Sequence, residues 1–265
     1  MPFATLGDMQ FYYERGGQGP PLLYISGTGG DLRARPSVFE GPLPRRFDVL
    51  AYDQRGMGQS AKPVIPYTMA DYADDAAKLM QSQGWSDAVV IGVSFGGMVA
   101  QEFVLRHPDK VRRLVLACTS PGGAGGASYP LHTIPPMMAE ERAKFMIPLL
   151  DVRRDEAWAK AHPDDYALLI AMNAANPFAE EPGHALGAAR QIEARKGHDT
   201  WERLDQIRCP VMIAAGLYDR VALPETQQKM AERIPGAQLQ MFNGGHLFNL
   251  QDPKALPAIM DFLEG

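Results

Sequence analysis

Cysteine is scarce in this sequence, and the scarcity limits the covalent links that the fold can use. Only Cys118 and Cys209 occur in 265 residues, which is too few for a disulfide framework. Cys118 ends one expected strand and Cys209 precedes another, so in a parallel sheet the two thiols would lie at opposite ends. We therefore expect two reduced cysteines in the core of a cytoplasmic protein.

The sequence also lacks long apolar runs and basic clusters. No run approaches the ~20 apolar residues that a membrane span needs. Residues 1–17 show neither the basic nor the apolar region of a signal peptide. The net charge is −5, and no group of Lys and Arg is placed to neutralise phosphates. The expected partner is therefore a small molecule rather than a membrane or a nucleic acid, and the expected location is the cytoplasm.

What the sequence does contain is a regular alternation of short apolar runs with helical patterns. Each run is short and almost continuously apolar, as is typical of parallel strands that are buried on both faces. Two earlier runs, Phe3–Leu6 and Phe11–Glu14, flank Gly7-Asp8 and predict a hairpin. The pattern predicts an α/β fold with a mostly parallel eight-stranded sheet flanked by helices, whose other strands are Leu22–Ile25, Val49–Tyr52, Ala88–Val93, Leu114–Ala117, Val211–Ala215 and Leu239–Phe242.

The alternation stops between residues 122 and 197. The glycine-rich stretch Gly122–Gly126 marks the point where the chain leaves the core. The residues that follow have helical patterns and no clear strand. We therefore expect a core made of residues 1–121 and 198–265, with residues 122–197 inserted as a helical cap.

The strongest functional signal lies in Val89–Gln101. A β-branched run precedes Gly92-Val-Ser94-Phe-Gly96, and a helical pattern follows it. This is the strand–turn–helix context of a nucleophile elbow, in which small flanking residues leave room for a strained serine. The helix N-terminus beneath Ser94 favours negative charge at the turn. The alternative is a glycine-rich turn that carries a serine by chance.

A serine nucleophile needs a base, and the base needs an orienting acid. Asp219 and His246 each follow the carboxyl end of an expected strand, where open α/β sheets place their ligands. The rival position for the acid, residues 119–128, contains no Asp or Glu. We expect Asp53 to have a structural role, with Arg55 bracing its loop through charge-assisted hydrogen bonds.

Donors for an oxyanion are expected from two backbone N–H groups. One belongs to Phe95, which follows the nucleophile, and the other to Thr28 in the glycine-rich loop after the strand Leu22–Ile25. An ordinary strand-to-helix turn is the alternative for that loop. Further side chains and glycines are expected to line an apolar substrate pocket, although a methionine-rich helical face more often reflects packing: Gly27, Gly29, Met137, Met138, Met146, Trp158, Val221 and Leu247.

Together these motifs resemble the α/β-hydrolase superfamily over essentially the whole chain. The resemblance rests on GTGGD at 27–31, DQRGMGQS at 53–60, GVSFGG at 92–97, Asp219 in GLYDR and His246 in GGHLFNLQDP. Within the superfamily, the sequence is most similar to the carboxylesterase and 3-oxoadipate enol-lactonase branch. It departs from the branch at Phe248 and Gln251, and it has Ser26 where many superfamily members have histidine.

The resemblance implies a serine hydrolase that cleaves a small carboxylic ester through a Ser94–His246–Asp219 acyl-enzyme mechanism. Lactonases, cofactor-free perhydrolases and C–C hydrolases share this triad, and receptor-like proteins of the fold retain it while mainly binding ligands. Dehalogenases and epoxide hydrolases of the fold instead use an aspartate nucleophile. Leu32 stands where a dinucleotide fingerprint needs its third glycine, and no metal-ligand spacing occurs. We expect no cofactor, no metal, and a monomer or homodimer.

Overall fold

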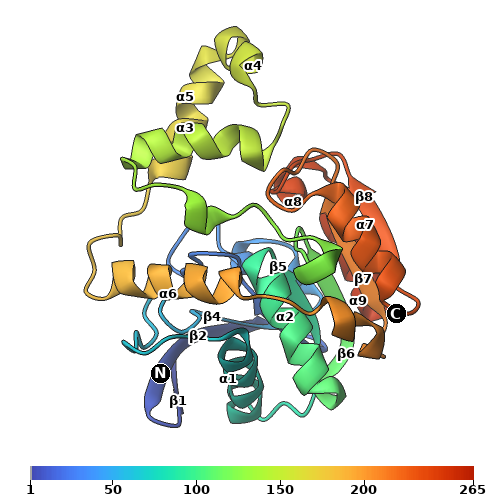
Figure 1. Cartoon of the computed structure of the whole chain (residues 1–265). Coiled ribbons are helices and arrows are strands. Elements are labelled where there is room, and N and C mark those ends of the chain that lie inside the picture. Colours follow the sequence, from blue (N-terminus) through green and yellow to red (C-terminus); the bar gives the residue numbers. More distant parts are fainter. Residues whose placement is uncertain (1) are drawn as a thin grey trace.

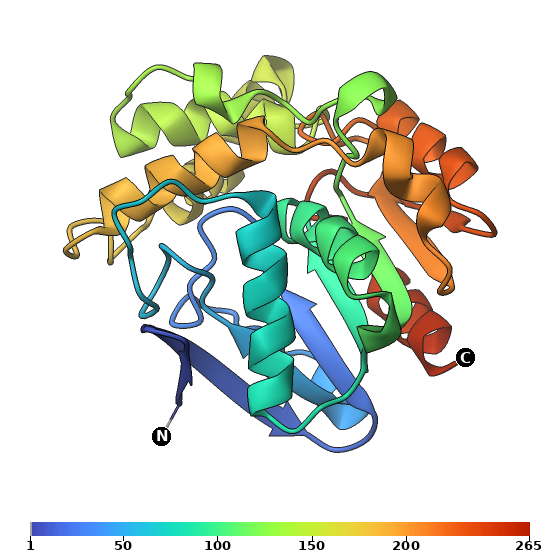
Figure 2. The same cartoon turned by 60° about the horizontal axis from the view of Figure 1, so that its bottom comes forward.

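The computed structural model describes residues 2–265, and its centre is a twisted sheet of eight strands (Figures 1 and 2). The strand order is β1-β2-β4-β3-β5-β6-β7-β8. β1 pairs antiparallel with β2, β2 pairs antiparallel with β4, and the remaining pairs are parallel. The mostly parallel sheet predicted from the sequence is therefore confirmed, and its strands are β1 (Phe3–Leu6), β2 (Met9–Gly17), β3 (Pro21–Ile25), β4 (Asp48–Tyr52), β5 (Ala88–Val93), β6 (Val111–Ala117), β7 (Val211–Gly216) and β8 (Gln238–Phe242).

Helices cover both faces of the sheet, which explains the continuous apolar character of the central strands. In β3, Leu23 belongs to one apolar cluster and Leu22 to the other, and both side chains are fully buried. The first cluster lies beneath helices α1 (Met69–Ser82), α2 (Phe95–Arg106) and α7 (Pro224–Arg233), and the second lies beneath α8 (Phe248–Gln251) and α9 (Ala255–Glu264). Burial on both faces removes the alternation that a half-exposed strand would show.

The segment predicted as a cap is helical and lies over the carboxyl ends of the parallel strands (Figure 1). It carries α3 (Ala139–Leu150), α4 (Glu156–Ala161), α5 (Pro163–Ala174) and α6 (His184–Lys196), all between β6 and β7 in the chain. α6 packs directly on the core, where a Cβ on Gly187 would stand 1.8 Å from the carbonyl oxygen of Gly56. The exact boundaries of the cap remain a prediction.

Both cysteines are free, with Cys118 buried and Cys209 half-buried. Within residues 2–265, no helix combines the length and the apolar character that crossing a membrane would require.

Candidate active site

Ser94 occupies a strained turn between β5 and α2. Its backbone has φ 55° and ψ −114°, a conformation that few residues other than glycine adopt. The glycines on either side are required by close contacts: a Cβ on Gly96 would stand 2.1 Å from the carbonyl oxygen of Ile25, and one on Gly92 would stand 2.4 Å from that of Gly96. The turn therefore has the tight geometry that the sequence motif predicts.

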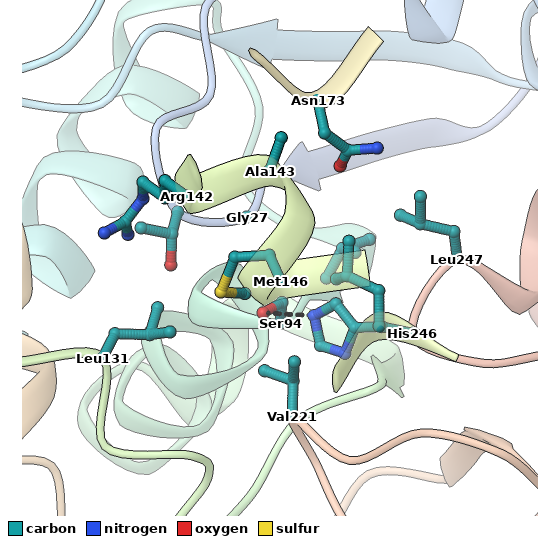
Figure 3. Close-up of a pocket in the computed structure, with 13 residues that line it drawn as sticks. Gly27, Ser94, Leu131, Arg142, Ala143, Met146, Asn173, Val221, His246 and Leu247 are labelled. Atoms are coloured by element: carbon teal, nitrogen blue, oxygen red, sulfur yellow. Dashed lines mark hydrogen bonds between the residues drawn. The ribbon is translucent and has the colours of Figure 1, made fainter. Parts of the chain in front are cut away.

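His246 and Asp219 extend from Ser94 as a chain of hydrogen bonds. The Nε2 atom of His246 lies 2.9 Å from Ser94 Oγ, and its Nδ1 atom lies 2.7 Å from Asp219 Oδ2. The dashed line in Figure 3 marks the hydrogen bond between His246 and Ser94. Because an ionised carboxylate only accepts, Nδ1–H donates to Asp219 and leaves the Nε2 lone pair free to accept the serine hydroxyl proton. The arrangement pairs a hydroxyl with a base, and the base with an acid.

The carboxylate of Asp219 is fixed from a second side. Its Oδ1 atom accepts the N–H groups of Val221 and Ala222 at 2.7 and 3.0 Å, and only 2% of the residue is exposed. With Oδ1 occupied in this way, Oδ2 is held toward the imidazole of His246. The short loop after β7 therefore positions the carboxylate without help from another side chain.

The two loops that carry the acid and the base approach each other closely. A Cβ on Gly216, the last residue of β7, would stand 2.0 Å from the carbonyl oxygen of Gly245. The Cys118 thiol is buried within range of the Asp219 charge, and burial together with that charge raises the pKa of the thiol well above its usual value. A thiol that stays protonated is a poor nucleophile, so this environment does not activate Cys118.

The residues that carry the expected oxyanion donors are both neighbours of Ser94, Phe95 in the chain and Thr28 in the cavity wall. Phe95 is the first residue of α2, where backbone N–H groups have no partner within the helix. Thr28 lines the cavity above Ser94, and a Cβ on the adjacent Gly27 would stand 3.5 Å from Ser94 Cβ. The N–H of Gly29 is instead donated to Gln191 Oε1 of α6 at 2.7 Å, so it is already engaged by the cap.

Asp53 stabilises the loop that carries these glycines. Its two carboxylate oxygens accept the N–H groups of Leu32 and Gln59 at 2.7 and 2.8 Å. Arg55 points elsewhere and forms hydrogen bonds of 2.6 and 2.8 Å to the carboxylate of Asp75 on α1. Asp53 therefore joins two loops through backbone donors, and the charge pairing of Arg55 fixes its loop to a helix.

A cavity of about 390 Å³ opens above Ser94 between the core and the cap (Figure 3). Most of its wall is apolar, which suits a small organic ligand. Its lining residues are Gly27, Thr28, Val93, Ser94, Leu131, Arg142, Ala143, Met146, Leu150, Asn173, Val221, His246 and Leu247. Four of the predicted substrate-contacting residues, Gly27, Met146, Val221 and Leu247, are thus brought to one cavity.

Four other residues predicted to contact substrate lie away from this cavity. Gly29 faces α6, as described above. Met137 and Met138 precede the first turn of α3, and Met138 is 74% exposed. Trp158 of α4 stacks on the ring of His162 with centroids 5.0 Å apart, so it serves the packing of the cap itself.

The sequence reasoning also missed part of the cavity wall. Ala143 and Leu150 lie on the same face of α3 as Met146, and this spacing would have identified them once the inward face of the helix was known. Arg142 and Asn173 add polar groups that no sequence motif marks. Within residues 2–265, no group of His, Cys, Asp and Glu side chains is arranged to hold a metal ion.

Comparison with solved structures supports the same architecture. The enol-lactonase from Burkholderia xenovorans LB400 aligns with a TM-score of 0.80 and 24% identity, covering 100% of both chains. A hydrolase from Pseudomonas aeruginosa PA01 aligns with a TM-score of 0.74 and 27% identity, covering 99% of this chain and 98% of that one.

Comparison with known sequences and with a family model identifies the family to which the chain belongs. A protein named "Putative carbamate hydrolase RutD" from Caulobacter sp. (strain K31) is 32% identical over 84% of this chain and 83% of its own length. A poly(3-hydroxyalkanoate) depolymerase from Ectopseudomonas oleovorans is 31% identical over 92% of this chain and 84% of its own length. The model of the family described as the alpha/beta hydrolase fold matches residues 20–253. The chain therefore belongs to the α/β hydrolase fold family.

Proposed function

We propose that this protein is a serine hydrolase that cleaves a small carboxylic ester through an acyl-enzyme. The observation that carries the proposal is the pair of hydrogen bonds on His246, 2.9 Å to Ser94 and 2.7 Å to Asp219, at the floor of a largely apolar cavity. Membership of the α/β hydrolase fold family supports hydrolysis as the general activity. The ester preference and the roles of individual residues are parts of the proposal.

In the proposed reaction, Ser94 Oγ attacks the ester carbonyl while His246 Nε2 takes the serine proton. Asp219 stabilises the resulting imidazolium and holds the ring in place. The N–H groups of Phe95 and Thr28 donate to the oxyanion of the tetrahedral intermediate. His246 then gives its proton to the departing alcohol. In the second half of the reaction, water attacks the acyl carbonyl while His246 Nε2 takes a proton from it, and His246 returns that proton to Ser94 Oγ as the acid product leaves.

The cavity supports a substrate of modest size. A volume of about 390 Å³ is at the small end of typical ligand sites, and Met146, Val221 and Leu247 provide apolar walls. A lactone would react by the same steps, but because it is a cyclic ester, the alcohol formed by ring opening would stay covalently attached to the acyl group. Because some relatives are named as putative carbamate hydrolases, carbamates are a third substrate class to test beside esters and lactones. Perhydrolase, C–C hydrolase and receptor-like activities share the triad and form the remaining alternatives.

A substrate panel tests the proposal. Steady-state turnover is measured for matched ester, lactone and carbamate substrates, and the formation of each product is followed by chromatography. We expect the ester to give the highest kcat/KM, and Ser94→Ala to abolish its turnover. A higher kcat/KM for the lactone or carbamate would reassign the substrate class. Binding of these compounds without turnover by the unmodified protein would contradict hydrolysis and favour a receptor-like role.

A further inference from the structure

A second, smaller cavity lies apart from the catalytic one, where the cap joins the core. Its volume is about 70 Å³, enough for a few waters or one small ligand. It borders the loop after β6, the segment that leads into the cap, the C-terminal turn of α6 and the residues that follow it. The polar side chains in its lining are those of Ser120, Ser128, His132, Arg195, Lys196 and His198.

The charge of this lining is of one sign. Arg195 and Lys196 are cations, and no Asp or Glu is among the lining residues. His198 adds no charge at neutral pH, because burial lowers its pKa to about 4. A cavity with cationic walls and no carboxylate favours a negatively charged occupant.

Arg195 is the unusual member of this set. Only 7% of the residue is exposed, and its guanidinium donates to two neutral acceptors, Tyr129 O at 2.8 Å and Ser128 Oγ at 2.7 Å. Burial without a nearby negative charge lowers its pKa to about 10. Arg55, the other buried arginine in residues 2–265, pairs with the carboxylate of Asp75. A buried charge normally has such a partner, and Arg195 has no carboxylate partner among residues 2–265.

Several buried polar atoms around the cavity also lack a hydrogen-bond partner in residues 2–265. They are Arg195 Nε, Ser120 Oγ and His198 Nδ1. His198 Nε2 lies 3.1 Å from the carbonyl oxygen of Ser120, so the neutral ring donates from Nε2. In this tautomer His198 Nδ1 can only accept, whereas Arg195 Nε can only donate and Ser120 Oγ can do either. Unsatisfied buried polar atoms are uncommon in folded proteins, and a cluster of them beside a cavity indicates a group that the chain itself does not supply.

From these observations we infer that the cavity is a binding site for a small monovalent anion, either chloride or a short carboxylate such as formate. Arg195 and Lys196 supply the charge. The ligand would contact the segment leading into the cap through Ser128 and the segment leaving it through Arg195. It would therefore join the two connections of the cap, which already meet where Gly122 pairs with Asp199.

Thermal unfolding at constant ionic strength tests the inference. The full-length protein is titrated with sodium chloride or sodium formate against sodium gluconate, an anion too large for a cavity of about 70 Å³. We expect Tm to rise and then saturate with chloride or formate, because a ligand that binds only the folded state stabilises it. Whichever of chloride and formate gives half of the maximal rise in Tm at the lower concentration is the preferred ligand of the cavity. A Tm that stays constant in both series would overturn the inference.

A matched pair of variants locates the effect. Arg195→Gln should remove the response of Tm to the anion, while Arg45→Gln, at an exposed arginine outside the cavity lining, should retain it. An equal response in Arg195→Gln would overturn the assignment. If Arg195→Gln does not fold, Lys196→Gln should weaken the response, raising the half-saturating concentration several-fold, and an unchanged value would count against the site.

Crystallography of the unmodified protein can detect a bound anion directly, without any variant. Crystals of the unmodified protein grown without chloride are soaked in bromide, and anomalous scattering locates the ion. We expect a bromide peak within the cavity, close to the Arg195 guanidinium. Ordered water alone in the cavity, with bromide elsewhere or absent, would contradict the proposal even if salts changed Tm.

Discussion

The backbone N–H of His246 donates a hydrogen bond of 2.6 Å to the carbonyl oxygen of Leu150, the last residue of α3. The loop that carries the proposed base is thus attached to the cap as well as to the core. The contact is possible because Gly245 has no side chain: a Cβ there would stand 2.1 Å from the same oxygen. The position of α3 and the position of His246 are therefore coupled.

Replacing Gly245 tests this coupling. Gly245→Ala should push the end of α3 away from His246 and lower kcat by roughly 10-fold to 100-fold, because small displacements of a catalytic group are costly. Gly16→Ala is a suitable control, since its added Cβ meets only Phe39 at 3.5 Å, an ordinary contact. Steady-state kinetics on a simple ester provides the measurement. Wild-type kcat in a folded Gly245→Ala protein would show that the contact does not matter.

Asp219→Asn should lower kcat by about 10⁴-fold. The amide oxygen would keep the N–H groups of Val221 and Ala222, which leaves an amide N–H facing His246 Nδ1. The imidazole proton would then move to Nε2, the atom that must accept the proton of Ser94. Asp53→Asn serves as the comparison, because Asp53 contacts backbone donors of two loops and not the imidazole. A larger loss of kcat in folded Asp53→Asn than in Asp219→Asn would mean that the acid is misassigned.

The proposed catalytic residues could be predicted from the sequence more completely than the residues that line the cavity. Ser94, Asp219 and His246 could be predicted because each follows a strand, and parallel strands bring their carboxyl ends to one edge. The wall of the cavity depends instead on which face of α3 turns toward the core. That orientation is a tertiary contact, so Met146 and Met138 looked equivalent in the sequence although only Met146 lines the cavity.

Long-range pairing also limited the prediction of the core. β2 continues to Gly17, beyond the predicted end at Glu14, because Tyr13–Gly17 pairs with β4. The local sequence does not indicate which strand pairs with this part of β2. The hydrogen bonds of Arg195 could not be predicted for the same reason, because its acceptors, Ser128 and Tyr129, lie 67 and 66 positions earlier in the chain.

Substitutions on α3 test where the acyl pocket lies. Met146→Trp should lower kcat/KM for a hexanoate ester by about 10-fold or more relative to an acetate ester, because the larger side chain fills the cavity. Met138→Trp, at a position that is 74% exposed, should leave that ratio unchanged. The ratio of kcat/KM for the two esters is the readout. Equal ratios in Met146→Trp and the wild type would place the acyl group elsewhere.

The burial of His198 predicts a pH dependence of stability. In the unfolded chain histidine titrates near 6.5, whereas burial lowers the pKa of His198 to about 4 in the native state. Between these values the unfolded state binds more protons, so stability is lost as pH falls from about 6.5 to about 4. The loss is on the order of 3 kcal/mol.

Urea unfolding in chloride-free buffer at pH 7.5 and 4.5 measures this effect. The wild-type protein should lose more stability than His198→Gln over the interval, and the difference between the two isolates the contribution of this residue from that of other titrating groups. Parallel losses in the two proteins would show that His198 titrates normally in the folded state.

Covalent labelling of Ser94 tests the central claim most directly. A fluorophosphonate reacts with a serine only when a neighbouring base activates it, and the labelled residue is located by peptide mass spectrometry. We predict a single adduct on Ser94 in the wild-type protein, and loss of both the adduct and ester turnover in Ser94→Ala. Labelling at another serine, or ester hydrolysis that survives in Ser94→Ala at the wild-type rate, would contradict the assignment of Ser94 as the nucleophile.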